Sequence, residues 1–178
     1  MFNSKTYIQR RTELKKKIGS GLILFLGNNE SPMNYTDNTY HFRQDSTFLY
    51  YFGLDQAGLA AVIDVDENKE IVYGNDFSID DIVWMGPQST IKQRALKCGV
   101  KQTAPLSELE TVCLNAIKQG RKIHFVPQYR YDNILKLHKL LGTAPKHAND
   151  YASTSLIRAI ADQRLVKSKE EIAEIEKA

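Results

Sequence analysis

The sequence is poor in cysteine and in long apolar runs. Its two cysteines, Cys98 and Cys113, lie apart and without CxxC spacing, which is typical of reduced core thiols and argues against a disulfide scaffold. No apolar run approaches the roughly 20 residues that a membrane-spanning helix needs. The N-terminus also lacks the apolar segment of a secretory signal. We therefore expect a cytoplasmic protein with no membrane partner.

Motifs for metal, phosphate or nucleophilic chemistry are also missing. There is no HExxH, no Gly-rich phosphate loop and no G-x-S-x-G elbow. The histidines lie in unrelated segments: His41, His124, His138 and His147. His124 falls inside a predicted strand, where a hydrogen-bonded structural histidine is typical. Asp64 and Asp66 could hold a divalent ion, but acids beside a turn are more often solvated, and we expect that here.

Charge of one sign is not concentrated either. The formal net charge is +3, whereas nucleic-acid-binding domains usually carry a dense cationic patch, so we expect no nucleic-acid partner. One basic cluster exists: Arg10 and Arg11 are followed by three lysines at 15–17, at helical spacing beside Leu14. This pattern favours a helix whose basic face is solvated.

Short apolar strands alternate with amphipathic helices along most of the chain. The continuous apolar run 22–27 predicts a strand buried on both faces. Residues 58–65 and 70–73 predict two strands joined by a tight turn, hence a hairpin. We also predict a helix that begins at Ser4 or Thr6 and ends at Gly19, helices at 89–97, 106–118 and 131–141, and a strand at 122–126. The combination favours a three-layer α/β/α domain with a mixed sheet.

Residues 40–54 are dense in aromatic side chains, with Arg43 and Asp45 set between them. As an extended segment, residues 47–54 would present Phe48 on one face and Tyr51 on the other. Both faces would be apolar, so we expect core packing rather than an open platform on which bases stack. Either Arg43 and Asp45 form a structural ion pair, or Asp45 caps the chain that follows it.

The end of the chain differs in kind from the rest. Ser168 and Glu171 form a capping box that opens a helix with Ile172 and Ile175 on its apolar side. The sequence ends after barely three turns of this helix, and a helix so short gains little stability alone. The segment therefore has the pattern of a connection to a further domain.

The aromatic stretch resembles the central signature of the N-terminal domain of aminopeptidase P, which prolidase and creatinase share more loosely. The family pattern is aromatic-x-Phe/Tyr-Arg-Gln-Asn/Asp-Ser-x-Phe-x-Tyr-x-x-Gly. The matching residues are Tyr40, Phe42, Arg43, Gln44, Asp45, Ser46, Phe48, Tyr50 and Gly53. The later stretch "DIVWMGPQ" is similar to the family's Trp-x-Gly element and places Trp84 and Gly86. The ending is similar to the family's R-x-x-K-S-x-x-E-I pattern, with Arg164, Lys167, Ser168, Glu171 and Ile172 in the matching places.

The resemblance implies a ribonuclease-H-like fold for residues 1–160, the creatinase and aminopeptidase P N-terminal domain. Residues 161–178 would be the linker and first helix of a C-terminal "pita-bread" catalytic domain. In the family that domain holds two Mn²⁺ ions with two Asp, one His and two Glu, and it hydrolyses the peptide bond before proline. None of those ligands would lie in this sequence, so we assign it no catalytic and no metal residue. The parent chain would be an Xaa-Pro aminopeptidase or dipeptidase, whereas this segment alone would not be an enzyme.

The resemblance also implies partners and one contact residue. The domain would contact its own C-terminal catalytic domain, build a homo-oligomer and narrow the entrance through which peptide substrates reach a neighbouring subunit's active site. Trp84, on the presumed loop of the Trp-x-Gly element, is our candidate for that contact, because an indole offers a large apolar surface to a proline ring or a partner subunit. The alternative is that Trp84 is buried inside its own domain.

Two other classes of function stay open. A nuclease would share the implied fold, but such nucleases place a metal-binding Asp on the first strand, and residues 22–27 hold no carboxylate. A peptidase-like module that binds a protein partner without catalysis would keep the architecture and lack the metal ligands downstream. The close match of the linker to the peptidases favours the peptidase.

Overall fold

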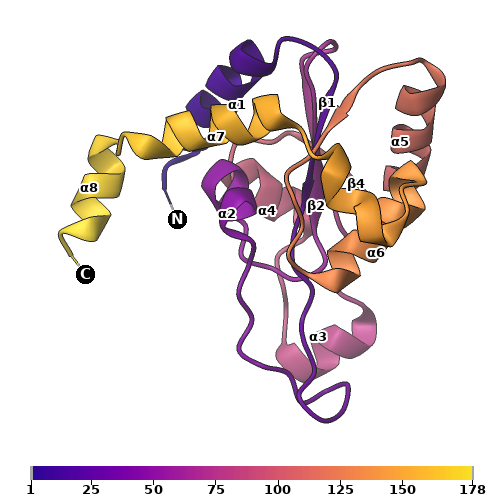
Figure 1. Ribbon diagram of the computed structural model, residues 1–178. Helices are drawn as coiled ribbons and strands as arrows, with labels where there is room; N and C mark the ends of the chain where they lie inside the picture. Colours follow the sequence, from indigo (N-terminus) through magenta and orange to yellow (C-terminus); the bar gives the residue numbers. More distant parts are fainter. Residues whose placement is uncertain (1, 178) are drawn as a thin grey trace.

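The computed structural model describes residues 2–177 and shows a five-stranded sheet between two layers of helices (Figure 1). The strands are β1 (Leu22–Leu26), β2 (Ala60–Asp64), β3 (Lys69–Tyr73), β4 (Gln102–Ala104) and β5 (Ile123–His124). Their order in the sheet is β4-β3-β2-β1-β5. Strand β2 runs antiparallel to β1 and β3, whereas β5 is parallel to β1 and β4 is parallel to β3. The predicted mixed sheet and hairpin are therefore confirmed.

Two hydrophobic clusters divide the helices into layers. One face of the sheet is covered by α1 (Ser4–Ile18), α2 (Ser46–Phe52), α4 (Ile91–Lys97) and α7 (Thr154–Leu165). The other face is covered by α5 (Glu108–Lys118), α6 (Tyr131–Leu141) and the 3-10 helix η1 (Pro145–Tyr151). Two short helices, α3 (Ile79–Met85) and α8 (Lys169–Ile175), bury no residue. The three-layer α/β/α prediction is confirmed, and α6 has the predicted bounds.

Strand β1 is the centre of the core because all five of its residues are buried. Successive side chains of a strand point to opposite faces. Ile23 and Phe25 accordingly join the cluster under α1 and α2, while Leu22, Leu24 and Leu26 join the cluster under α5 and α6. A strand covered by helices on both sides needs apolar residues at every position, which explains the unbroken run in the sequence.

Residues 46–52 of the aromatic stretch form a helix, whereas residues 47–54 were predicted to be extended. The Asp45 carboxylate accepts hydrogen bonds of 2.9 Å from the backbone N–H groups of Thr47 and Phe48, and this cap starts α2. Gly53 ends the helix in the left-handed conformation at φ 62°, and a Cβ at this position would overlap the Tyr7 hydroxyl. The prediction of capping by Asp45 is thus confirmed, and the period-of-two reading is wrong.

Core packing of the aromatic side chains is confirmed by α2. Phe48, Tyr51 and Phe52 are fully buried, and their spacing of three and four residues puts them on one helical face. Phe25 of the sheet packs against two of them, with ring centroids 5.2 Å from Tyr51 and 5.5 Å from Phe52. These distances lie in the range that favours aromatic pairs.

The basic cluster of α1 lies partly inside the protein, which corrects the prediction of a solvated face. The Arg11 side chain is fully buried. Its guanidinium donates hydrogen bonds to Glu70 Oε2 at 2.7 Å, the Tyr51 carbonyl at 2.8 Å and the Cys98 carbonyl at 3.0 Å. Lys15 pairs with the second Glu70 oxygen at 2.9 Å. The buried charge is therefore paired, and each of its three guanidinium nitrogens donates a hydrogen bond, which is what makes its burial tolerable.

His124 is a buried structural histidine, as predicted. Its Nδ1 lies 2.7 Å from Ser153 Oγ, and the same serine caps α7 through a hydrogen bond from the Leu156 N–H. Burial, followed by the nearby Lys122 charge, lowers the pKa of His124 below its ordinary value of 6.5, although a hydrogen bond to the Ser20 backbone opposes the shift. The imidazole is therefore held neutral where β5 meets α7. The two cysteines are also buried and unpaired, as predicted.

Replacing Arg11 with methionine should destabilise the fold strongly. The change would leave two buried carbonyl groups without donors and deprive Glu70 of one partner, so we expect a loss of about 3–5 kcal/mol in the free energy of unfolding. Urea unfolding measures it. Lys16→Met, at an exposed position of the same helix, is the matched control, and equal losses in the two variants would contradict this account.

The His124 environment predicts acid sensitivity. Because the folded-state pKa lies below 6.5, the unfolded chain binds a proton before the folded chain does, so stability is fully present above about pH 6.5 and falls as the pH is lowered. Urea unfolding at pH 7.5 and 5.5 should show this loss, and His124→Gln should show less of it. The same pH dependence in both proteins would rule His124 out as its source.

Candidate functional site

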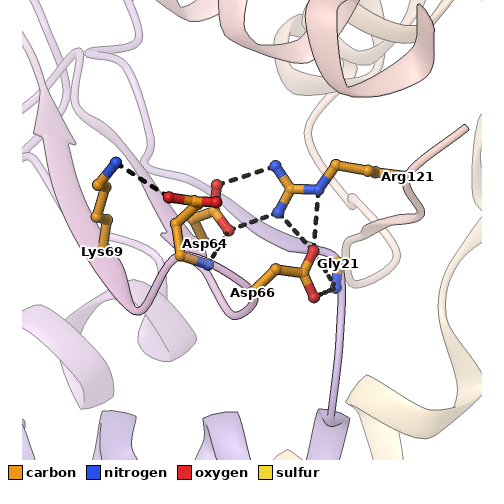
Figure 2. A network of polar contacts seen from close by, with 6 residues as sticks. Gly21, Asp64, Asp66, Lys69 and Arg121 are labelled. Atoms are coloured by element: carbon orange, nitrogen blue, oxygen red, sulfur yellow. Dashed lines mark hydrogen bonds and ion pairs between the residues drawn. The ribbon is translucent and has the colours of Figure 1, made fainter. Parts of the chain in front are cut away.

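The carboxylates singled out in the sequence form a closed ion-pair network (Figure 2). Arg121 Nη1 donates to Asp64 Oδ2 at 3.0 Å, and its Nε donates to Asp66 Oδ2 at 2.9 Å. Asp66 also accepts a hydrogen bond of 3.0 Å from the Gly21 N–H. The expectation of a solvated acid is therefore wrong for Asp64, whereas Asp66 is exposed as expected and is also paired. The network joins the β2–β3 turn to the segments preceding β1 and β5, which is a structural role.

The charged groups of this network shift one another's pKa values. Burial acts to raise the pKa of Asp64. The hydrogen bonds that its carboxylate accepts from Arg121 and from the Glu67 backbone N–H outweigh this effect, so the pKa of Asp64 lies below its usual value. The hydrogen bond to Asp64 likewise raises the pKa of Arg121. The pair thus stays charged at neutral pH. Within residues 2–177, no group of three or more His, Cys, Asp or Glu side chains could hold a metal ion.

Trp84 lies in helix α3, not in a loop as predicted, and 88% of its surface is exposed. This exposure excludes the alternative of a tryptophan buried in its own domain. The other apolar residues of the helix are exposed as well: Ile79, Ile82, Val83 and Met85. A helix that shows apolar side chains to solvent all round is unusual for a monomeric surface and marks an interaction site.

Strong local signals explain why α3 forms although none of its residues is buried. Ser78 and Asp81 make a reciprocal capping box, with hydrogen bonds of 2.8 Å and 3.1 Å, and the Gly86 N–H closes the helix on the Ile82 carbonyl. The Asp81 carboxylate lies in the first turn, where the positive end of the helix dipole stabilises a negative charge. The hydrogen bonds of the two caps, rather than burial of side chains, therefore stabilise α3.

The segments on either side of α3 are anchored to α4. Before α3, Asp76 accepts a hydrogen bond of 2.6 Å from the Ile91 N–H. Also before α3, the Phe77 ring lies 5.2 Å from the Arg94 guanidinium of α4. After α3, Arg94 donates a hydrogen bond of 3.0 Å to the Ser89 carbonyl. The apolar helix is thus held out from the body, at the end of the molecule away from α1 (Figure 1).

The C-terminal segment forms a second exposed apolar surface. Helix α8 begins with the predicted capping box, in which the Ser168 N–H donates to Glu171 Oε2 at 2.9 Å. It stands apart from the body of the protein in Figure 1. Its apolar side, Ile172 and Ile175, is exposed, and so is Val166 in the connection from α7.

One buried arginine ties α8 to the domain. Arg10 Nη2 lies 3.4 Å from Glu171 Oε1, while the same guanidinium donates to the Tyr50 carbonyl at 2.8 Å. It stacks 3.9 Å from the Tyr50 ring and 4.9 Å from the Phe2 ring. Like Arg11, this residue was expected in a solvated face, and it lies instead at the base of the C-terminal segment.

Comparison with known proteins decides the family. The model of the family described as "Aminopeptidase P, N-terminal domain" matches residues 7–124. The chain belongs to this family. The resemblance seen in residues 40–53 is thereby confirmed, and the matched range includes Trp84.

Two curated relatives of this aminopeptidase P domain carry the same description. A protein of Aspergillus terreus described as "Probable Xaa-Pro aminopeptidase" is 27% identical over 170 residues, covering 95% of this chain and 33% of that protein. A protein of Ajellomyces capsulatus with the same description is 26% identical, covering 95% of this chain and 32% of that protein. The chain thus spans about a third of the length of the curated relatives it matches.

Solved structures share the fold. Aminopeptidase P from E. coli in its low-pH form superposes with a TM-score of 0.74 at 20% identity, covering 97% of this chain and 41% of that chain. The aminopeptidase PepP of Pseudomonas aeruginosa gives 0.77 at 17% identity, covering 97% and 40%. Within residues 2–177, no helix combines the length and the apolar character needed to cross a bilayer.

Replacing Trp84 with alanine should leave the stability of this chain unchanged. An exposed side chain without packing partners contributes little to folding, so we expect a change within about 0.5 kcal/mol, against a loss of about 3–5 kcal/mol for Phe52→Ala in the core. Urea unfolding of the two variants tests this. A large loss for Trp84→Ala would mean that α3 packs on its own domain.

Proposed function

We propose that this chain is the non-catalytic N-terminal domain of a metal-dependent Xaa-Pro aminopeptidase or dipeptidase, which hydrolyses the peptide bond before proline. The domain serves oligomerisation and shapes the entrance to a neighbouring subunit's active site. Family membership, the descriptions of the relatives and the share of their length that this chain spans support the proposal. The observation that carries it is α3, five of whose seven residues are exposed apolar side chains.

Trp84 is the contact residue of the proposal. An indole combines a large apolar face with an N–H donor, and such residues dominate the energetics of protein interfaces. Its neighbours on α3 would surround it with further apolar area, which a partner subunit could bury. The rigid caps of α3 lower the entropic cost of binding, since the helix is ordered before contact.

The C-terminal segment supports the second half of the proposal. We assign residues 1–160 to the domain and residues 161–178 to the linker and first helix of the catalytic domain. Helix α7 crosses this boundary, so the chain leaves the domain body only after Leu165. The exposed Ile172 and Ile175 of α8 would be covered by the catalytic domain, and the Arg10–Glu171 ion pair sets the direction in which the chain leaves.

The metal chemistry belongs to the rest of the parent chain. Two Mn²⁺ ions would supply an activated water for hydrolysis there. In the part of the chain that the structure describes, no group of three or more His, Cys, Asp or Glu side chains could hold a metal ion, and we assign no step of that reaction to its residues. An alternative is a peptidase-like protein-binding module without catalysis, which would use the same exposed faces to hold a partner.

In the full-length protein, Trp84→Ala should weaken the oligomer or raise KM for an Xaa-Pro peptide. Loss of the indole removes a central apolar contact, which typically costs about 2–4 kcal/mol at an interface hot spot. Sedimentation velocity and peptide hydrolysis measure the two effects. Tyr151→Ala, which removes another exposed aromatic side chain, is the matched control and should change neither.

Four outcomes of this experiment separate the functions. Dissociation without loss of activity per subunit assigns Trp84 to assembly, and a raised KM in an intact oligomer assigns it to the entrance. No effect on either quantity would contradict the role of Trp84. A wild-type protein that hydrolyses no Xaa-Pro peptide with Mn²⁺ present would instead favour the binding module.

A further inference from the structure

A cavity of about 340 Å³ lies between α5 and α6, above the sheet. Its apolar lining comes from both helices, from the loop before α5 and from the sheet: Leu26, Ala60, Leu106, Leu109 and Leu140. Its polar lining consists of Asn75, Ser107, Glu110, Lys136 and Lys139. This volume and this mixture of many apolar and few polar groups are typical of small-molecule sites. None of the lining residues belongs to α3 or α8.

The cavity occupies a favoured position in the topology. Strands β1, β3, β4 and β5 all run in one direction, so their carboxyl ends meet at one edge of the sheet. After β3 the chain passes to α4 on one face, and after β4 it passes to α5 on the other. Asn75 follows β3 and Ser107 follows β4. Ligands of open α/β sheets bind outside the carboxyl ends of strands where the connections diverge in this way.

Lys136 is the most unusual polar group of the cavity. Its ammonium donates one hydrogen bond, of 3.1 Å, to Asn29 Oδ1, and it forms no ion pair with a carboxylate of the described residues. Asp132, one helical turn earlier, pairs with Arg130 at 3.2 Å instead. An ammonium has three donors, so two remain for a ligand. Burial lowers the pKa of Lys136, as it does for a cation whose hydration is not replaced.

The other polar groups leave the cavity with a net positive charge. Lys139 and Glu110 pair with each other at 3.1 Å, so Lys136 is the uncompensated charge. The side-chain oxygen of Asn75, Oδ1, accepts a hydrogen bond of 3.3 Å from the Leu106 N–H. The side-chain N–H₂ group of Asn75 is therefore left as a donor. The Ser107 hydroxyl makes no capping hydrogen bond to α5. Donors therefore outnumber acceptors around an apolar floor.

We infer that this cavity binds a small amphipathic carboxylate, with the carboxylate at Lys136 and the aliphatic part on the leucine floor. A carboxylate supplies the acceptors that Lys136 lacks, and a charge-assisted hydrogen bond is about twice as strong as a neutral one. A fully hydrated anion would not suit this cavity, because it offers no apolar group to pack against the leucine side chains that line it. The inference does not depend on the proposed peptidase role, since it rests on residues outside both exposed surfaces.

Hexanoate is the probe that tests the site. Titrated into the full-length protein labelled with ¹³C at the leucine methyl groups, it should give saturable shifts at Leu26, Leu109 and Leu140. Hexanamide, which has the same chain and no charge, should bind about tenfold more weakly, as expected for loss of one charge-assisted hydrogen bond. Lys136→Gln should weaken hexanoate by a similar factor and leave hexanamide unchanged.

Lys97→Gln is the matched control, because Lys97 is an exposed lysine on α4, on the opposite face of the sheet. This variant should bind hexanoate as the wild type does. The absence of saturable methyl shifts would overturn the inference. So would equal affinity for hexanoate and hexanamide, or equal weakening by Lys97→Gln and Lys136→Gln. The comparison of the two probes uses the unaltered protein, so it stands even where Lys136→Gln fails to fold.

Discussion

The buried guanidinium of Arg11 is the interaction on which one whole layer of the domain depends. It joins α1 to three other elements. Its partners are the Tyr51 carbonyl in the last turn of α2, the Glu70 carboxylate of β3 and the Cys98 carbonyl at the end of α4. A charge so deeply buried is tolerable only while every donor has a partner. The four elements must therefore be in place together, and this fixes α2 with its buried aromatic rings against Phe25 of the sheet. Lys15 completes the pairing of Glu70 at the edge of the core.

The burial pattern reverses the usual rule at two places, and both reversals have a physical reason. Basic side chains of α1 are inside, because α2 and α4 present carbonyl groups and β3 presents a carboxylate to them. Apolar side chains of α3 are outside, although the helix is capped at both ends and anchored to α4 on both sides. Local hydrogen bonds order α3, and no part of the described chain covers it. Exposing this apolar area to water is unfavourable, so the surface is more typical of a site that contacts another protein.

Much of the fold could be predicted from the sequence, because burial and capping leave local patterns. The run 22–27 predicted β1, the amphipathic segment 131–141 predicted α6, and Ser168 with Glu171 predicted the start of α8. The period-of-two prediction for residues 47–54 failed because the Asp45 cap starts a helix there and Gly53 ends it. Helices α3 and α7 and strand β4 were not predicted. The serines at 78 and 153, which cap the two helices, were the available signals.

Tertiary pairings were beyond the reach of local patterns. Arg121 lies more than fifty residues along the chain from Asp64 and Asp66, so nothing in the sequence showed that it would neutralise them. The same holds for Arg11, whose partners come from three other elements. Of the candidate site, Trp84 was found from the resemblance alone. Its exposure and its place on an apolar helix could not be predicted, because a short apolar run fits a buried segment equally well.

We propose that α3 and α8 are surfaces that a partner subunit and the catalytic domain cover in a longer parent protein. Amide hydrogen exchange, compared between this 178-residue chain and that parent protein, tests this proposal, with the buried helix α2 as internal reference. We expect fast exchange of α3 and α8 in the short chain and strong protection of both in the parent protein, with α2 alike in the two. Equal, fast exchange of α3 and α8 in both proteins would contradict it.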